Sequence, residues 1–170
     1  MEIRQERADD YNTVFHVVAE AFSHAEHSDG NEQELVKALR DTPSFIPELS
    51  LVALEDGKIV GHILFSKIAI GEYTELALAP LSVLPAYQRR GIGLALIREG
   101  HRIAKQLGYD YSVVLGSPTY YPRAGYLPAS LYGINAPFEV RDEYFMAFKL
   151  QDSAPQLKDV VKYDPAFEID

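Results

Sequence analysis

The chain has 170 residues, a formal net charge of −9, 47% hydrophobic residues and no cysteine. This length suits one domain with a substantial core, and the hydrophobic content argues against a disordered chain. The absence of cysteine excludes disulfides, cysteine–zinc sites, iron–sulfur clusters and thiol nucleophiles. The acidic balance disfavours nonspecific nucleic-acid binding, but it is compatible with a small anion held in a local basic pocket.

Membrane and secretion signals are not evident in the sequence. No stretch approaches the roughly 20 consecutive apolar residues that a membrane-spanning helix needs. The opening residues, MEIRQERADD, do not show a basic segment followed by an apolar one. We therefore expect a soluble cytoplasmic protein with no membrane partner.

The first half of the chain predicts one strand, two helices and a hairpin. EIRQER predicts a short strand, and ADDYNTVFHVVAEAF predicts a helix with Asp9 or Asp10 as its N-cap. NEQELVKALR predicts a second helix, and the prolines in DTPSFIPEL predict a connection. Asp56 and Gly57 stand between LSLVALED and KIVGHILFSKIAI, which favours a tight turn between two strands.

The second half predicts a helix between strands. ELALAPLSVLP reads as a strand in which Pro80 favours a bulge or splay. LPAYQRRGIGLALIREG leads into a long amphipathic helix, YDYSVVLG and EYFMAFKL predict strands, and SPTYYPRAGY is too broken for a long element. We expect a mixed α/β (α+β) domain, with antiparallel hairpins first and one helix-linked crossover later. Residues 151–170 are expected to pack on the domain or at a dimer contact.

A basic, glycine-containing turn precedes the long helix. Gly91 and Gly93 allow positive φ or close approach of the backbone to a ligand. Backbone N–H groups in such a turn, together with the helix start, can bind an anion, and Arg89 and Arg90 add positive charge. Five of the sixteen Lys and Arg residues lie within residues 89–105. The alternative is a glycine-rich helix cap with solvated arginines.

Two well-known phosphate motifs do not fit this turn. The pattern G-x-x-x-x-G-K-[ST] does not occur in the chain, and the dinucleotide fingerprint G-x-G-x-x-G fails because position 96 is Leu. The spacing alone therefore indicates an anion site without identifying the anion.

Two segments resemble one enzyme family. LSVLPAYQRRGIGLALIREGHRIAKQLGYDYSVVLG resembles motif A of the GNAT (GCN5-related) N-acetyltransferases, in which a strand runs into [Q/R]-x-x-G-x-[G/A]. YYPRAGY resembles the family's F-Y-x-x-x-G-F, with Tyr in place of Phe at both ends. The resemblance covers roughly residues 2–150 and is closest to a bacterial subgroup of uncertain substrate. It implies a single GNAT-like domain, whose mostly antiparallel central sheet has a splayed strand pair and flanking helices.

The resemblance also implies a co-substrate, acetyl-CoA, and no metal. Its pyrophosphate would bind backbone N–H groups of the glycine turn, and its pantetheine arm would pair with the preceding strand like an extra strand. A bulge at Pro80 would open the cleft for that arm. The residues implied in cofactor binding are Leu81, Ser82, Val83, Gln88, Arg89, Arg90, Gly91, Ile92, Gly93, Leu94 and Tyr121.

Acetyl transfer to an amine poses two proton problems. An alkyl ammonium with a pKa near 10.4 must lose a proton, which costs about 4.6 kcal/mol at pH 7. The leaving thiolate benefits from a proton donor, and a tyrosine hydroxyl can be that donor. Tyr121 matches the family's acid tyrosine, and Tyr120 is the second choice, although both could be packing aromatics. Glu75 begins the strand that resembles the base-bearing strand and is the first candidate base; a solvated carboxylate there, with water as base, is the alternative.

The remaining polar residues carry weaker signals. His24 and His27, with Glu26 and Asp29, could hold a metal or line the acceptor pocket, but polar surface is favoured because further ligands are not evident. His62 and His101 are expected to be structural or exposed.

The sequence therefore predicts transfer of an acetyl group from acetyl-CoA to an amine by direct attack in a ternary complex. The acceptor, a small-molecule or protein amine, is not readable, and a homodimer is left open. One rival is a catalytically silent acyl-CoA-binding or sensor module. The other is a nucleic-acid-binding protein that uses the basic helix, which the net charge of −9 disfavours.

Overall fold

The structure is a computed structural model that describes residues 1–25 and 28–169. The helices are α1 (Tyr11–Phe22), α2 (Glu32–Arg40) and α3 (Ile92–Gln106), and the strands are β1 (Glu2–Gln5), β2 (Phe45–Glu55), β3 (Lys58–Ile70), β4 (Tyr73–Val83), β5 (Tyr111–Leu115), β6 (Leu127–Pro128), β7 (Ile134–Asn135), β8 (Phe145–Lys149) and β9 (Asp159–Lys162).

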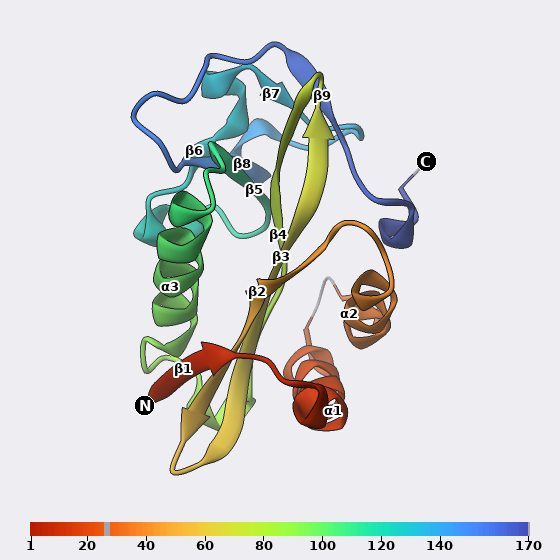
Figure 1. Cartoon of the computed structure of the whole chain (residues 1–170), viewed down its shortest axis with the longest axis vertical. Coiled ribbons are helices and arrows are strands. Elements are labelled where there is room, and N and C mark those ends of the chain that lie inside the picture. Colours follow the sequence, from red (N-terminus) through yellow and green to blue (C-terminus); the bar gives the residue numbers. More distant parts are fainter. Residues whose placement is uncertain (26–27, 170) are drawn as a thin grey trace.

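The strands form a central sheet in the order β1-β2-β3-β4-β5-β8-β6, and β9 pairs with both β3 and β7. Among the described strands only the β4–β5 and β7–β9 pairs are parallel. In Figure 1 the helix α3 lies against one face of the sheet, and α1 and α2 lie against the other. The predicted mixed α/β fold, with a mostly antiparallel sheet and flanking helices, is therefore confirmed.

The hairpin between β2 and β3 has the turn that its sequence predicts. Asp56 and Gly57 have φ angles of 50° and 77°, and Glu55 pairs with Lys58 across the turn. Two successive positive φ angles match the twist of the flanking strands. This hairpin aligns the two long strands on which the rest of the sheet is built.

The start of β2 differs from the prediction. The strand begins at Phe45 and runs through Pro47, where the sequence predicted a connection. Its pairing with β3 is irregular between Phe45 and Ser50, so Pro47 falls where the ladder is interrupted. A proline, which has no N–H to donate, is tolerated in such a stretch.

A bulge in β4 lies at the predicted proline. Ile63 of β3 pairs with Leu81, whereas Phe65 pairs with Leu78, so one extra residue of β4 is inserted around Pro80. Such an insertion bends the strand and increases its twist. The second half of β4 is thereby turned relative to the first.

The strands β4 and β5 pair over a short stretch only. Leu76 lies beside Ser112 and Ala77 beside Val113, and β4 then continues through residues 78–83 without a β5 partner in the described chain. This is the splayed pair that the resemblance implies. It leaves one edge of the second half of β4 available to another extended chain.

The described part of the C-terminal segment, residues 151–169, packs on the domain. Val161 of β9 pairs with Ile70 of β3, and Leu157 is buried in a second apolar cluster formed with β3, β5 and β8. This segment therefore shares the sheet and the core of the preceding residues. The predicted boundary between the domain and a C-terminal tail at residue 150 stays a prediction.

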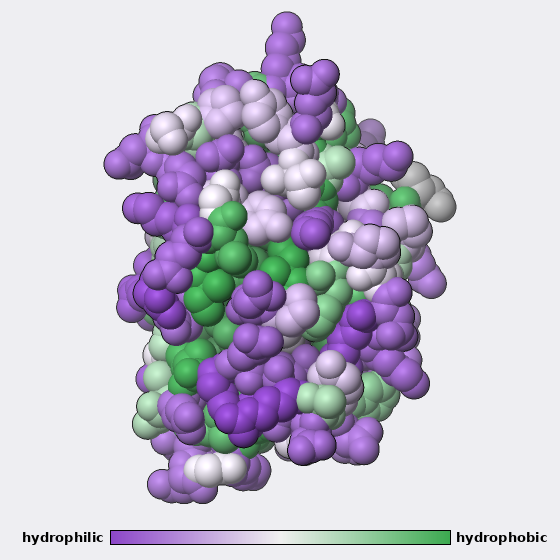
Figure 2. Space-filling model, viewed as in Figure 1, coloured by the Kyte–Doolittle hydropathy of each residue, from purple (hydrophilic) through white to green (hydrophobic). Residues whose placement is uncertain are grey.

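The surface is mostly polar on the face seen in Figure 2, where apolar side chains gather over α3 and the adjoining part of the sheet. None of the described helices combines the length and apolar character that crossing a membrane would require.

Candidate active site

The turn before α3 has two residues in the left-handed region. Arg89 has a φ angle of 65°, and Gly91, the N-cap of α3, has a φ angle of 83°. Successive N–H groups in such a turn can form a concave anion site, to which the unpaired N–H groups of the helix start add. A left-handed arginine costs about 1 kcal/mol or more, which is typical of functional turns. A side-chain carbon built on Gly91 has no heavy atom within 4 Å, so the turn is open there.

Polar and aromatic contacts hold this turn. The Gln88 side-chain amide donates to the Val83 carbonyl oxygen at 3.1 Å, which ties the turn to the end of β4. The guanidinium of Arg90 lies 5.2 Å from the ring centroid of Tyr87, and the Lys58 ammonium lies 5.9 Å from the same centroid. The cations therefore cluster beside the turn and favour an anionic ligand there.

The segment of β4 predicted to contact pantetheine has one free edge. Leu81, Ser82 and Val83 pair with β3 on the other edge only. The Ser82 hydroxyl is buried and has no hydrogen-bond partner within the described residues. Backbone N–H and C=O groups along such an edge can bind an extended, amide-containing chain as a further strand would.

Tyr121 lies in the segment that follows β5. It opens the short helix η3 (Tyr121–Ala124), and its ring packs directly on Gly116 after β5. Burial raises the pKa of the Tyr121 hydroxyl well above its ordinary value of 10, so the hydroxyl stays protonated at neutral pH. Its ring meets those of Tyr120 and Tyr126 edge to face, with centroid separations of 5.1 and 5.8 Å.

A buried hydrogen-bond network is centred on Tyr126, whose ring contacts that of Tyr121. The Tyr126 hydroxyl lies 3.0 Å from His101 Nε2 and 2.9 Å from Ser112 Oγ, which joins α3, β5 and the segment after η3. His101 stacks on Phe148, and burial lowers the pKa of His101 to about 4, so the ring is neutral. This network was not predicted from the sequence. The one signal for it was Tyr at position 126, where the family motif has Phe, because the added hydroxyl needs hydrogen-bond partners when it is buried.

Glu75 lies at the other end of β4 from the pantetheine segment. It is 1% exposed, so the alternative of a solvated carboxylate is wrong. Its Oε1 accepts the backbone N–H groups of Asp110 and Tyr111, at 2.9 and 3.2 Å. Burial raises the pKa of Glu75 to about 7, and the two N–H groups partly oppose that rise. Glu75, a residue of β4, therefore contacts the start of β5 in the part of the sheet where β4 and β5 are still paired.

The histidine His62 belongs to a second buried network. Its Nε2 lies 2.9 Å from Ser50 Oγ, which donates to Glu6, and Glu6 pairs with Arg40 of α2 at 2.6 Å. Burial lowers the pKa of His62 to about 3. The expectation of a structural His62 is thus supported, and the ring braces β3 against the N-terminal segment.

The loop between α1 and α2 provides no metal site in the described chain. Glu26 and His27 lie outside the described residues, and both His24 and Asp29 are exposed. Asp29 accepts the backbone N–H of Asn31. No cluster of three or more metal-ligating side chains forms within residues 1–25 and 28–169.

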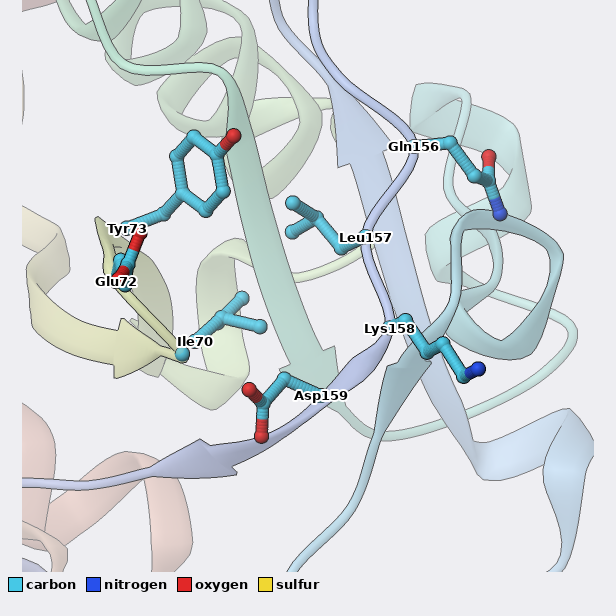
Figure 3. A pocket seen from close by; sticks show the side chains of 8 residues that line it. Ile70, Glu72, Tyr73, Gln156, Leu157, Lys158 and Asp159 are labelled. Atoms are coloured by element: carbon cyan, nitrogen blue, oxygen red, sulfur yellow. The ribbon is translucent and has the colours of Figure 1, made fainter.

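A pocket of about 230 Å³ lies at the far end of the sheet. Figure 3 shows Ile70, Glu72 and Tyr73 of the β3–β4 hairpin opposite Leu157 and Asp159 of the C-terminal segment. It is at the opposite end of β4 from the glycine turn. None of the sequence-predicted site residues lines it, so the candidate site is the splayed cleft and not this pocket.

Comparison with known proteins identifies the class of protein. The family described as Acetyltransferase (GNAT) family matches residues 5–126. The chain therefore belongs to the GNAT family, and its class is that of the N-acetyltransferases.

Individual relatives cover most of the chain. It is 40% identical over 130 residues to the Escherichia coli protein named uncharacterized N-acetyltransferase YjhQ, covering 74% of this chain and 72% of the relative. The crystal structure of Escherichia coli YhbS in complex with CoA has a TM-score of 0.89 and 26% identity, covering 99% of this chain and 92% of that chain. A GNAT acetyltransferase from Brucella melitensis in complex with acetyl-CoA has a TM-score of 0.80 and 37% identity, covering 98% and 97%.

Proposed function

We propose that the protein transfers an acetyl group from acetyl-CoA to an amine by direct attack in a ternary complex. The observation that carries the proposal is the left-handed, arginine-rich turn at the start of α3, which follows the half of β4 that has no β5 partner in the described chain. The structures of two similar proteins, from Escherichia coli and Brucella melitensis, contain CoA and acetyl-CoA. These relatives support acetyl-CoA as the anionic ligand of the turn.

The residues of the cleft fit such a ligand. The N–H groups from Arg89 to Leu94 and the charges of Arg89 and Arg90 suit a pyrophosphate, and the open space at Gly91 leaves room for it. The free edge of Leu81, Ser82 and Val83 suits the two amides of pantetheine. Acetyl-CoA supplies the activated acetyl group as a thioester.

We assign the role of proton donor to Tyr121. The amine nitrogen bonds to the acetyl carbon while the carbon–sulfur bond breaks, so negative charge develops on the sulfur. Tyr121 donates its hydroxyl hydrogen to that sulfur, and the raised pKa of Tyr121 keeps the donor protonated before the reaction. The acylated nitrogen then loses its extra proton, which restores the Tyr121 hydroxyl. Burial of the ring excludes water, which strengthens the hydrogen bond.

Glu75 remains our candidate for the base that takes the proton from the ammonium. Its pKa of about 7 suits a base that works at neutral pH. Its contacts with Asp110 and Tyr111 also support a second role, in which it braces the start of β5. The two roles predict different effects of Glu75→Gln, which are described in the Discussion.

The net charge of the chain bears on the chemistry of the amine acceptor. The net charge of −9 favours a cationic amine, such as a polyamine, an aminoglycoside or a lysine side chain. A panel of such amines, with release of the CoA thiol as readout, tests this. Tight acetyl-CoA binding without turnover on any amine would favour the rival acyl-CoA sensor.

The decisive test of the CoA site is a matched pair at position 91. Asp and Asn both tolerate the left-handed conformation of Gly91, but only Asp adds a negative charge. We expect Gly91→Asp to weaken CoA binding roughly 100-fold relative to Gly91→Asn in titration calorimetry, since a carboxylate would face the pyrophosphate. Equal affinities in two folded variants would refute the proposed site.

A further inference from the structure

The hydroxyl of Tyr120 lies against the first turn of α3. A side-chain carbon built on Gly93 would overlap the Tyr120 hydroxyl oxygen and lie 3.4 Å from the ring carbon that carries it. The same position is 3.6 Å from Leu81 Cδ2. The Tyr120 hydroxyl therefore occupies the junction between the pantetheine edge of β4 and the start of α3.

This contact gives Gly93 a role that differs from that of Gly91. Gly91 needs a left-handed backbone, and the space beside it is open. Gly93 is helical and buried, and the space beside it holds the Tyr120 hydroxyl. The missing side chain at position 93 thus makes room for a protein group.

The Tyr120 ring is held in place, but its hydroxyl is not bonded. The ring lies edge to face against Tyr121 at 5.1 Å, and the Arg123 guanidinium is 5.8 Å from its centroid. The hydroxyls of Tyr111 and Tyr126 have protein partners. The Tyr120 hydroxyl forms no hydrogen bond in the part of the chain that the structure describes, and half-burial raises the pKa of Tyr120, which keeps the donor protonated.

We infer that Tyr120 is a cofactor-binding residue whose hydroxyl donates a hydrogen bond to an oxygen of CoA between its pyrophosphate and its pantetheine arm. Gly93 is the residue that admits this hydroxyl to the cleft. The inference rests on the proposed function, since it needs CoA in the splayed cleft. It assigns different tasks to adjacent tyrosines: Tyr120 contributes to binding, and Tyr121 acts at the leaving sulfur.

The first experiment removes one oxygen atom. Tyr120→Phe keeps the ring, and we expect CoA to bind roughly tenfold more weakly in titration calorimetry, as for loss of one hydrogen bond. With an amine substrate, the change should fall on KM for acetyl-CoA and not on kcat. The matched control is Tyr163→Phe, a partly buried tyrosine of the C-terminal segment, which should leave CoA affinity unchanged.

The second experiment is a double-mutant cycle with Gly93→Ala. The added methyl group must displace the Tyr120 hydroxyl, so this variant should lose at least as much CoA affinity as Tyr120→Phe. When Tyr120 is already Phe, the methyl group has no hydroxyl to displace. The double variant should therefore bind CoA about as well as Tyr120→Phe alone, a clear departure from additivity.

Three results would overturn the inference. They are unchanged CoA affinity in Tyr120→Phe, additive losses in the cycle, or a fall in kcat with unchanged affinity, which would make Tyr120 the proton donor. Thermal unfolding without ligand shows whether each variant is folded, and Tyr120→Phe carries the test if Gly93→Ala is not. A failure here with a large effect of Gly91→Asp overturns only the Tyr120 role, whereas no effect of Gly91→Asp overturns the CoA site itself.

Discussion

Two polar residues near opposite ends of β4, Glu75 and Ser82, are equally buried, but they differ in how their polar groups are satisfied. Glu75 and Ser82 are each 1% exposed. Glu75 accepts two backbone N–H groups where β4 and β5 are paired, whereas the Ser82 hydroxyl has no partner among the described residues. Buried polar groups are normally paired, so an unpaired one needs a reason. Burial alone would not distinguish Glu75 from Ser82, but the unpaired Ser82 hydroxyl does, and it supports our proposal that the ligand binds at this end of β4.

The largest expected effect is on the rate of catalysis, from a substitution in the proposed cleft. We expect Tyr121→Phe to lower kcat about 100-fold, because the leaving sulfur loses its proton donor. CoA affinity should change by less than about threefold. Steady-state kinetics and calorimetry on the same preparation separate the two quantities, and an unchanged kcat would show that Tyr121 is a packing residue.

At the paired end of β4, the main effect should be on stability. Glu75→Ala leaves the N–H groups of Asp110 and Tyr111 without an acceptor and should lower the free energy of unfolding by about 2–3 kcal/mol. Glu75→Gln keeps an acceptor oxygen and should cost less than about 1 kcal/mol. Urea denaturation measures both; equal stability of Glu75→Ala and wild type would show that the brace contributes nothing.

A smaller loss of stability is expected from the buried hydrogen-bond network around Tyr126. Tyr126→Phe leaves His101 Nε2 and Ser112 Oγ without their shared partner and should cost about 1–2 kcal/mol of unfolding free energy. If the network also positions Tyr121, kcat should fall severalfold while KM for acetyl-CoA is unchanged. A stability loss with wild-type kcat would limit the network to a structural role.

A further effect is a pH dependence of stability at Glu75. Its pKa is raised from 4.5 to about 7 in the folded protein, so the folded state binds more protons than the unfolded state between these values. The unfolding free energy contributed by this group therefore falls as pH rises from about 4.5 to 7. Wild type should lose stability relative to Glu75→Gln between pH 5 and pH 8, as measured by unfolding midpoints.

The same variant separates the two roles of Glu75. If Glu75 is the base, kcat/KM should rise with pH through about 7 in wild type, and this limb should disappear in Glu75→Gln. If Glu75 is only a brace, the limb should persist and only stability should change.

Local patterns predicted the elements that carry strong local signals. The Asp56–Gly57 turn, the bulge at Pro80 and the amphipathic helix after the glycine turn are all present. Each depends on backbone preference or periodicity within a few residues, which a sequence shows directly. The prediction failed for Pro47 in β2, because tolerance of a proline depends on the strand next to it.

Contacts between distant segments could not be predicted in this way. The glycine spacing indicated an anion site, but it did not show that Tyr120 fills the space beside Gly93. Likewise, the burial of His101 depends on Tyr126 and Phe148, which belong to other elements. Such contacts come from tertiary packing, and the sequence gives only a hint of them through Tyr at positions where the motif has Phe.

The pairing of β9 with β3 affects how the domain can fold during synthesis. Val161 pairs with Ile70, so these partners are about ninety residues apart in the chain. Contacts of such long range slow folding, because a large loop must close before they form. On the ribosome, the apolar surface that β9 covers would stay exposed until residue 161 has emerged, and this is the interval in which a chaperone would be needed most.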